Sequence, residues 1–168
     1  MTTLYLVRHG ETVDNANRIM QGQTQGLLNE NGIKQAREFS EEWKNKPLDV
    51  VIASDLKRSI DTAKIIAEPH HLEVQSTPLL RERDWGSFTG RYIPDLKGET
   101  WPDDIETLEN LLSRAREFIA YVKATFPEKK VLAVGHGIMN KAIQAVYYGK
   151  QMNEVQRMTN AEVRILEL

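Results

Sequence analysis

The chain lacks cysteine, an excess of positive charge and long apolar runs. Without cysteine, neither disulfide bonds nor thiolate chemistry can contribute to stability or activity. A formal net charge of −2 over 168 residues excludes a broad basic surface for nucleic acid or acidic lipid, so an anion site must be local. The first apolar run, residues 4–7, is far too short to span a membrane and follows no basic residues. We therefore expect a cytoplasmic protein that binds a small ligand, without a nucleic-acid or membrane partner.

The composition that remains is typical of a globular protein, with 40% hydrophobic and 27% charged residues. The length fits one domain, so we predict a single domain over residues 1–168. One stretch, residues 84–104, contains glycines and prolines alternating with two tryptophans, a phenylalanine and a tyrosine. Aromatic side chains at this density are seldom left in water. This favours a small ordered lid or cap over the alternative, a surface loop anchored by its aromatics.

Short apolar runs alternate with segments of helical spacing. The runs predict strands at residues 4–7, 49–53 and 130–134, with weaker candidates at 72–75 and 163–166. Helical spacing predicts helices over about 30–45, 56–67, 104–125 and 138–148, the first capped by Asn29 and the last ended by Gly149. The alternation predicts an α/β fold with helices on both faces of a largely parallel sheet. Its ligand site should lie beyond the carboxyl ends of the strands.

Two of the four histidines occupy equivalent places, because His9 and His136 each follow a predicted buried strand and precede a glycine. Both should emerge at the same edge of the sheet. The glycines would let the backbone approach a ligand closely, and the helix after His136 would offer free N–H groups to an anion. Arg8 precedes His9, and a third strand end leads to Arg58 in the first turn of a helix. Three strand ends thus bring two arginines and two histidines together.

This set of side chains indicates phosphoryl chemistry. Guanidinium groups bind phosphate oxygens bidentately and neutralise the charge that develops during transfer. A neutral imidazole can attack phosphorus and form a phosphohistidine that water can open. Glu82, near the 84–104 segment and Trp85, is the predicted proton donor to the leaving group, with Asp84 in reserve. Because the arginines and the second histidine supply positive charge, we expect no metal and no cofactor.

At these residues the sequence resembles the histidine phosphatase superfamily, also called the phosphoglycerate mutase-like family. The matching blocks run in order along nearly the whole chain: Leu6-Val7-Arg8-His9-Gly10-Glu11-Thr12, Asn15, Gln21-Gly22, Leu28-Asn29 to Gly32-Gln35-Ala36, Ser54-Asp55-Leu56-Lys57-Arg58-Ser59 with Thr62-Ala63, Leu80-Arg81-Glu82, Gly98-Glu99-Thr100 and Gly135-His136-Gly137. The resemblance implies a three-layer α/β/α sandwich around a mixed sheet in which one strand runs antiparallel.

The resemblance also assigns roles residue by residue. It implies His9 as the phosphorylated nucleophile and Glu82 as the proton donor. It implies Arg8, Arg58 and His136 as phosphate ligands. Further substrate-binding positions are expected at Asn15, Gln21, Gly22 and Gly137. The predicted activity is hydrolysis of small phosphomonoesters, such as phosphorylated metabolites, through a phosphohistidine on His9.

Two departures from the family pattern affect this interpretation. Thr89-Gly90 stands where the family often has Glu-Gly, which puts the contact made by that glutamate in doubt. Only 53 residues separate Glu82 from His136, whereas the similar mutases carry longer insertions that enclose their substrate. The short span favours a phosphatase with a small cap, because a mutase must keep water from its phosphohistidine. Two alternatives remain: a phosphoglycerate mutase, and a catalytically silent phosphate-binding module.

Other polar residues receive more modest interpretations. The His70-His71 pair follows Glu68-Pro69 and is better explained as a solvated turn than as a metal site. Arg83 and Arg91 could hold an anionic part of the substrate or lie in solvent. The physiological substrate and the oligomeric state are not determined by the sequence.

Overall fold

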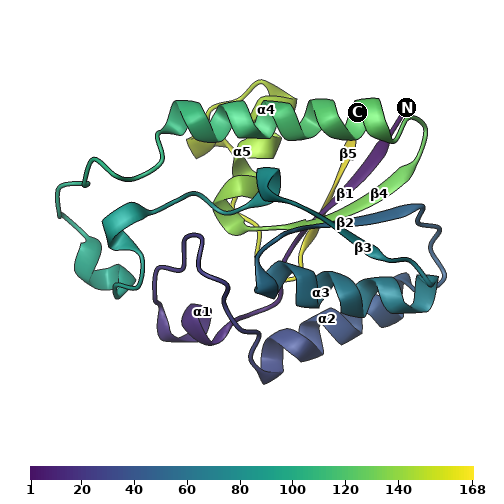
Figure 1. Cartoon of the computed structure of the whole chain (residues 1–168), viewed down its shortest axis with the longest axis horizontal. Helices are drawn as coiled ribbons and strands as arrows, with labels where there is room; N and C mark the ends of the chain where they lie inside the picture. The colour runs from purple at the N-terminus through teal and green to yellow at the C-terminus, as the bar shows by residue number, and fades with distance from the viewer.

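The computed structural model describes all residues, 1–168, and has one five-stranded sheet between two layers of helices (Figure 1). The strands are β1 (Thr3–Arg8), β2 (Val50–Ser54), β3 (Val74–Thr77), β4 (Lys130–Gly135) and β5 (Val163–Glu167). They lie in the order β3-β2-β4-β1-β5, and all neighbours are parallel except β5, which runs antiparallel to β1. The predicted three-layer α/β/α fold with a mostly parallel, mixed sheet is confirmed.

Helices cover both faces of the sheet, with α4 and α5 on one face and α2 and α3 on the other (Figure 1). The α-helices are α1 (Val13–Asn17), α2 (Glu30–Trp43), α3 (Lys57–Ala67), α4 (Leu108–Thr125) and α5 (Gly137–Tyr148). Short 3-10 helices are η1 (Glu68–His70), η2 (Pro78–Leu80), η3 (Gly86–Phe88), η4 (Ile93–Leu96) and η5 (Met152–Glu154). Each of the four long helices corresponds to one predicted from the sequence. None of the helices is long and apolar enough to cross a membrane.

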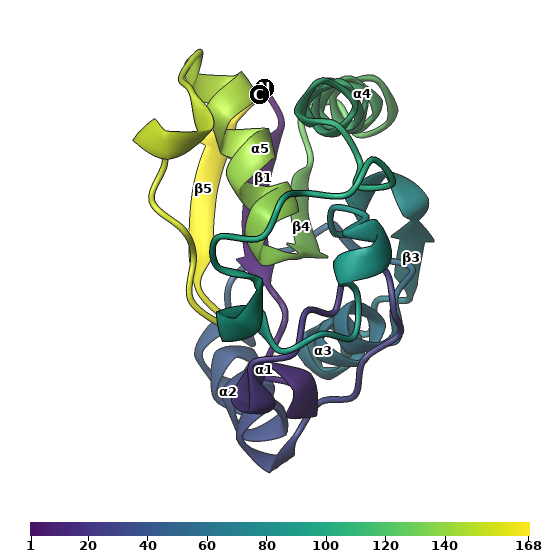
Figure 2. The ribbon, with the colours of Figure 1, turned by 90° about the vertical axis from the view of Figure 1, so that its left-hand side faces the viewer.

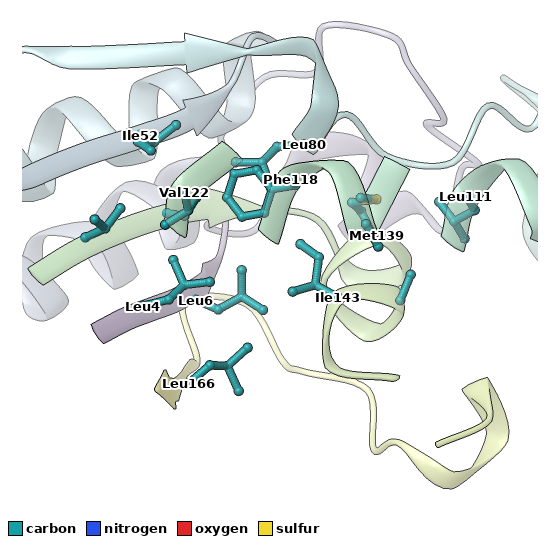
Figure 3. Close-up of a cluster of buried hydrophobic side chains, with 14 residues drawn as sticks. Leu4, Leu6, Ile52, Leu80, Leu111, Phe118, Val122, Met139, Ile143 and Leu166 are labelled. Atoms are coloured by element: carbon teal, nitrogen blue, oxygen red, sulfur yellow. The ribbon is translucent and has the colours of Figure 1, made fainter. Parts of the chain in front are cut away.

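Two buried clusters hold the layers together. On one face, Leu6 of β1 belongs to a cluster with Phe118 of α4 and Ile143 of α5 (Figure 3). On the other face, the buried rings of Phe39 and Trp43 of α2 stack with centroids 5.1 Å apart. Successive side chains of a strand point to opposite faces, and both faces are buried here. This is why the central strands are continuous apolar runs in the sequence.

The chain reverses its winding direction between β1 and β4, the two central neighbours. The long helix after β1 is α2, whereas β4 is followed by α5 on the opposite face. In such sheets a crevice opens beyond the carboxyl ends of the two strands. Arg8 pairs with Gly135 in the parallel register, so His9 and His136 leave the sheet side by side. The histidines therefore emerge at one edge of the sheet, as predicted.

The 84–106 loop, which is the predicted lid with two more residues, lies in front of this edge of the sheet (Figure 2). The loop has a small apolar core of Phe88, Leu96 and Ile105, against which Trp85 and Met20 pack. Its backbone also pairs with the segment after α1, since the Met20 N–H donates to the Arg91 carbonyl at 2.9 Å. The loop is thus anchored by its aromatics and is attached to the edge of the crevice.

Helix α4 begins at Leu108, capped by Thr107, rather than near residue 104 as predicted. The difference arises because residues 104–106 close the base of the 84–106 loop. The Asp104 carboxylate accepts a hydrogen bond from the Ser87 N–H at 3.0 Å. The Glu106 N–H donates to the Asp84 carbonyl at 2.8 Å. These pairings span about twenty residues of sequence, so helical spacing alone did not reveal them.

Candidate active site

A cavity of about 260 Å³ opens beyond the carboxyl ends of β1 and β4. It is lined by thirteen residues: Arg8, His9, Asn15, Ile19, Met20, Gln21, Gly22, Arg58, Glu82, Trp85, Ile93, Ile138 and Arg157. Seven of the nine site residues expected from the sequence are among them. The other two, His136 and Gly137, do not line the cavity but lie directly behind it.

His9 is buried, and its ring is held in one tautomer. The ring Nδ1 lies 2.6 Å from the Gly10 carbonyl oxygen, which can only accept a hydrogen bond. Nδ1 therefore carries the proton, and Nε2 keeps a lone pair that no protein group engages. Burial, and then the charge of Arg58, lower the pKa of His9 well below its ordinary value of 6.5. At neutral pH the imidazole is neutral and presents a nucleophilic nitrogen.

His136 is fully buried beside His9, with ring centroids 5.1 Å apart. Its Nε2 lies 2.8 Å from the Ser54 hydroxyl and 3.2 Å from the Ser59 hydroxyl. Ser54 also accepts from the Leu56 N–H, so its own proton is available for Nε2. With the ring proton on Nδ1, the Ser54 hydroxyl can donate to Nε2, and Nδ1 is left as a free donor. Burial, and then the charge of Arg58, lower the pKa of His136 as well, so both imidazoles are neutral.

The two predicted arginines are held by backbone carbonyls. Arg58, only 1% exposed, donates from Nη2 to the Gly22 carbonyl at 2.8 Å and from Nη1 to the Thr24 carbonyl. Arg8 donates from Nη1 to the Met158 carbonyl at 2.8 Å. Burial is the main reason that the pKa of each guanidinium falls to about 10, so both remain charged at neutral pH. Fixed in this way, the arginines leave other N–H groups free.

Three buried donors around His9 have no partner in the protein. They are Nε of Arg8, Nε of Arg58 and Nδ1 of His136. Buried polar groups are nearly always hydrogen-bonded, because each one left unsatisfied costs about 1–3 kcal/mol. An anion with several acceptor oxygens would engage all three. The unpartnered nitrogens thus belong to residues for which the sequence predicts phosphate binding.

Glu82 lies against the N-terminus of α5. Its Oε1 accepts from the Met139 N–H at 2.9 Å, and its Oε2 accepts from the Ile138 N–H at 3.1 Å. The prediction that the helix after His136 offers its free N–H groups to a bound anion is therefore wrong for these two donors. They hold the Glu82 carboxyl instead, since a carboxylate is favourable at a helix N-terminus.

The glycines that follow the two histidines allow close packing of the protein around the cavity. A Cβ on Gly10 would lie 2.5 Å from the carbonyl oxygen of Gly32, so Gly10 lets the segment after β1 approach the first turn of α2. A Cβ on Gly137 would lie 3.3 Å from the Arg8 guanidinium carbon. Each glycine therefore leaves space that a side chain would fill.

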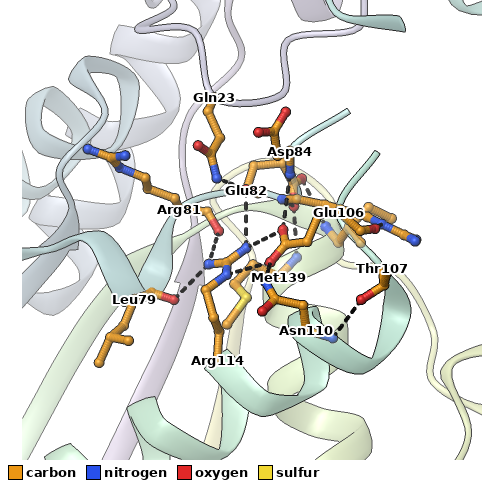
Figure 4. Close-up of polar contacts among 12 residues, drawn as sticks. Gln23, Leu79, Arg81, Glu82, Asp84, Glu106, Thr107, Asn110, Arg114 and Met139 are labelled. Carbon is orange, nitrogen blue, oxygen red and sulfur yellow. Dashed lines mark hydrogen bonds and ion pairs between the residues drawn. The ribbon is translucent and has the colours of Figure 1, made fainter. Parts of the chain in front are cut away.

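The segment that carries Glu82 is held from behind by Arg114 of α4 (Figure 4). Nη1 of Arg114 donates to the carbonyls of Leu79, at 3.0 Å, and Arg81, at 2.9 Å. Nη2 pairs with the carboxylate of Glu106 at 2.7 Å. Only 16% of the Arg114 side chain and 6% of the Glu106 side chain are exposed. Through this buried ion pair and its hydrogen bonds, Arg114 connects α4 to the base of the 84–106 loop and to the segment that precedes Glu82.

We predict that Arg114→Met lowers the free energy of unfolding by about 3 kcal/mol, because it removes the cation from the buried Glu106 carboxylate and the donor from two carbonyls. Urea denaturation measures this loss. The double variant Arg114→Met/Glu106→Gln should lose less than the sum of the two single variants. Arg116→Met, on the exposed side of α4, is the matched control and should remain within about 0.5 kcal/mol of the parent. Strict additivity in the double variant would contradict this assignment.

The other residues that the sequence predicts to bind substrate lie at the edge of the cavity, where each also makes a hydrogen bond within the protein. Asn15 uses its Oδ1 to accept from the Thr12 N–H at 3.1 Å, and its amide group faces no protein acceptor. Gln21 accepts from the Thr12 hydroxyl through Oε1 at 2.9 Å. Gly22 contributes its carbonyl to Arg58 and adopts a positive φ of 53°. Asn15 and Gln21 therefore retain free amide N–H groups at the cavity, whereas Gly22 shapes its wall.

Several residues weighed in the sequence lie away from the cavity. Asp84, the reserve acid, is exposed and accepts from the Gly86 N–H. Arg91 pairs with Glu99 at 2.7 Å. Arg83 donates to the Glu106 carbonyl and lies over the ring of Trp85, 5.1 Å from its centroid. The His70-His71 pair occupies η1 and the turn after it.

Sequence reasoning missed two groups of cavity residues. Arg157 comes from the loop between η5 and β5, and its position after an unremarkable polar stretch gave no signal. Ile19, Met20 and Ile138 form an apolar rim with two residues of the 84–106 loop. Met20 directly precedes Gln21, and Ile138 directly follows Gly137, both of which belong to the blocks that match the family. This adjacency is the one sequence signal that could have indicated them.

The fold and the cavity together indicate the class of protein. Two neutral histidines and two buried guanidinium groups at the switch point of an α/β sheet are typical of an enzyme that acts on phosphate esters. The chain belongs to the histidine phosphatase superfamily (branch 1), whose family model matches residues 4–168. The family resemblance seen in the sequence is confirmed. Phosphatases among the relatives and structural neighbours support hydrolase activity.

Two relatives illustrate the range of the family. The uncharacterized phosphatase PhoE of Bacillus subtilis (strain 168) is 41% identical over 141 residues, which cover 82% of this chain and 72% of that protein. The probable phosphoglycerate mutase GpmB of Proteus mirabilis (strain HI4320) is 34% identical over 152 residues, covering 82% of this chain and 71% of that protein. The sequence similarity thus extends to both a phosphatase and a mutase.

Solved structures agree with the fold over almost the whole chain. YhfR of Bacillus stearothermophilus superposes with a TM-score of 0.91 at 26% identity, covering 100% of this chain and 92% of that one. The mycobacterial glucosyl-3-phosphoglycerate phosphatase Rv2419c, in complex with VO3, has a TM-score of 0.90 at 28% identity and covers 98% and 92%.

Proposed function

We propose that this enzyme hydrolyses small phosphomonoesters through a phosphohistidine on His9, with Glu82 as the general acid and base. The observation that carries the proposal is the neutral His9 ring, whose free Nε2 faces a cavity surrounded by three unpartnered buried donors. Donors without partners favour an anion with several oxygens, and the neutral nitrogen beside them is suited to attack its central atom.

In the first step, Nε2 of His9 forms a bond to phosphorus as the ester P–O bond breaks. Glu82 gives its proton to the departing alkoxide. Nε of Arg8, Nε of Arg58 and Nδ1 of His136 donate to the phosphoryl oxygens, where charge develops in the transition state. In the second step, a water molecule attacks phosphorus, Glu82 takes its proton, and the P–N bond breaks to restore neutral His9. Because the arginines supply the positive charge, no metal takes part.

We infer that hydrolysis, rather than phosphoglycerate mutation, is the principal activity. Only 53 residues separate Glu82 from His136, and the 84–106 loop is the single insertion in that span that reaches the cavity. It contributes Trp85 and Ile93 and acts as a small cap. A short cap leaves water access to the phosphohistidine, which favours hydrolysis over transfer back to a retained product. The phosphatase relative at 41% identity supports the same choice.

The test is turnover of an aryl phosphate in excess chelator, with rapid acid-free quenching to trap the phosphorylated enzyme. We expect unchanged rates in chelator and phosphate on the protein that is labile to acid and stable to alkali. Loss of activity on chelation would exclude the metal-free mechanism. Interconversion of phosphoglycerates faster than their hydrolysis would favour the mutase instead. Stabilisation by inorganic phosphate without any turnover would indicate a silent binding module.

A further inference from the structure

The peptide group between Gly10 and Glu11 joins two hydrogen bonds in series. Its carbonyl oxygen lies 2.6 Å from Nδ1 of His9 and accepts the proton of that ring. Its N–H donates to Oε1 of Gln35, a residue of α2, at 2.9 Å. Because a peptide N–H can only donate, the oxygen of the Gln35 amide, and not its nitrogen, must face Glu11. Gln35 is therefore connected to the imidazole of His9 through a single peptide group.

Close packing of α2 against the segment after β1 fixes this arrangement. A Cβ on Gly32 would overlap the Glu11 carbonyl oxygen, so glycine is required for the first turn of α2 to approach Glu11. The same carbonyl accepts from the Asn29 N–H at 3.1 Å, just before α2 begins. Gln35 follows Gly32 by three residues and so lies on the same face of the helix. Its side chain thus reaches the N–H of Glu11.

The preceding peptide group, between His9 and Gly10, is held by residues of other segments. Its carbonyl accepts from Nδ2 of Asn160 at 3.0 Å, and its N–H donates to the Thr62 hydroxyl at 3.1 Å. Gln35 is the one side chain other than His9 that bonds to the next peptide group along the chain. The acceptor of the His9 ring proton is therefore supported from one side only, by Gln35.

Hydrogen bonds in series polarise one another. An acceptor on a peptide N–H increases the negative charge on the carbonyl oxygen of that peptide, which then binds the Nδ1 proton more strongly. When Nε2 of His9 bonds to phosphorus, Nδ1 keeps its proton and the ring takes up positive charge. Burial, and then the charge of Arg58, lower the pKa of His9, whereas the hydrogen bond to Gly10 raises it. Among these influences, the bond to Gly10 alone favours the charged ring.

We propose that Gln35 is a positioning residue that increases the nucleophilicity of His9 through the Gly10–Glu11 peptide group. The inference rests on the proposed function and deepens it. A more basic imidazole attacks phosphorus faster and leaves phosphorus more slowly. Removal of the Gln35 acceptor should therefore slow formation of the phosphohistidine without slowing its hydrolysis. A purely structural role would slow both steps.

The kinetic test is Gln35→Met, which removes the acceptor oxygen with little change in side-chain volume. With a nitrophenyl phosphate, rapid-quench measurement of phosphate on the protein gives the rates of formation and decay of the phosphohistidine. Formation should slow by about 3- to 10-fold, as expected for loss of one neutral hydrogen bond, and decay should not slow. Gln35→Glu keeps an acceptor oxygen and adds a negative charge, so formation should be at least as fast as in the parent and decay should be slower.

Two control variants match these changes. Gln75→Met makes the same replacement at an exposed glutamine of β3. Asn31→Asp adds a carboxylate at an exposed position in the first turn of α2, where the Glu11 N–H already has its acceptor in Gln35. Both controls should keep the parental rates of both steps. Equal slowing of formation and decay in Gln35→Met would overturn the proposal.

A second measurement does not require turnover. In protein labelled with ¹⁵N at histidine, the Nδ1 proton of His9 is the signal that disappears in His9→Ala. Its resonance should move to higher field in Gln35→Met, where the bond to Gly10 weakens, and to lower field in Gln35→Glu, where the bond strengthens. If Gln35→Met does not fold, Gln35→Glu decides. A resonance that Gln35→Glu leaves unchanged would overturn the proposal. If the parent forms no phosphohistidine, the proposed function has failed, and these shifts still test the connection between Gln35 and His9.

Discussion

His9→Ala should abolish turnover, lowering kcat by about 10⁴-fold or more, because the variant lacks the nitrogen that becomes phosphorylated. No acid-labile phosphate should be trapped on the protein. The donors around the vacated position belong to Arg8, Arg58 and His136, so inorganic phosphate should still raise the midpoint of thermal unfolding. Steady-state kinetics and a thermal melt with and without phosphate measure these two effects separately.

The matched control is His71→Asn, which changes an exposed histidine outside the cavity. His71 has a positive φ of 55°, a conformation that asparagine tolerates well, so the variant should fold and retain parental activity. Turnover by His9→Ala within tenfold of the parent would contradict a covalent role for His9. Loss of phosphate-dependent stabilisation together with loss of turnover would instead indicate that the cavity had collapsed.

Glu82→Gln should separate the two halves of the reaction according to the leaving group. With an alkyl phosphate, whose alkoxide needs a proton, formation of the phosphohistidine should slow by about 10²- to 10⁴-fold. With a nitrophenyl phosphate, whose phenolate leaves without one, the first step should stay fast and the second should slow, because no base then activates water. Stopped-flow measurement should therefore show a stoichiometric burst of nitrophenolate followed by slow turnover.

The control for this variant is Asp84→Asn, two residues away. Asp84 is exposed and uses its carboxylate to accept from the Gly86 N–H, which an asparagine oxygen can also do. It should show parental rates on both substrates. A Glu82→Gln enzyme that is slowed equally on alkyl and aryl esters in the first step would argue against Glu82 as the proton donor. Glu82 would then act only by positioning neighbouring groups of the site.

Most of the fold could be predicted because its signals are local. Apolar runs predicted the five strands, and helical spacing with capping residues predicted the four long helices, including Gly149 as the end of α5. The direction of β5 was not readable from its residues, since parallel and antiparallel strands share the same alternation. Only the family resemblance implied a reversed strand. In the structure, the chain returns through η5 and pairs β5 antiparallel to β1.

The candidate site was predictable where its residues directly follow strands. Parallel strands end at one edge, so His9 and His136 had to be neighbours once β1 and β4 were adjacent. Interactions between distant segments were not predictable in this way. The N–H groups after Gly137 hold Glu82 rather than an anion, and Arg114 fixes that carboxyl's segment from a helix 32 residues farther along the chain.

The sequence alone thus determined the class of fold and indicated the candidate histidines, arginines and acid, because these depend on periodicity and on short motifs at strand ends. Only the tertiary structure decided which polar atoms stay unpartnered, which tautomer His9 adopts and that Arg157 reaches the cavity. Partnership and burial depend on atoms brought together from distant parts of the chain, and no local pattern encodes such contacts. For that reason the phosphoryl chemistry could be proposed from the sequence, whereas the free donors around the cavity could be identified only in the folded molecule.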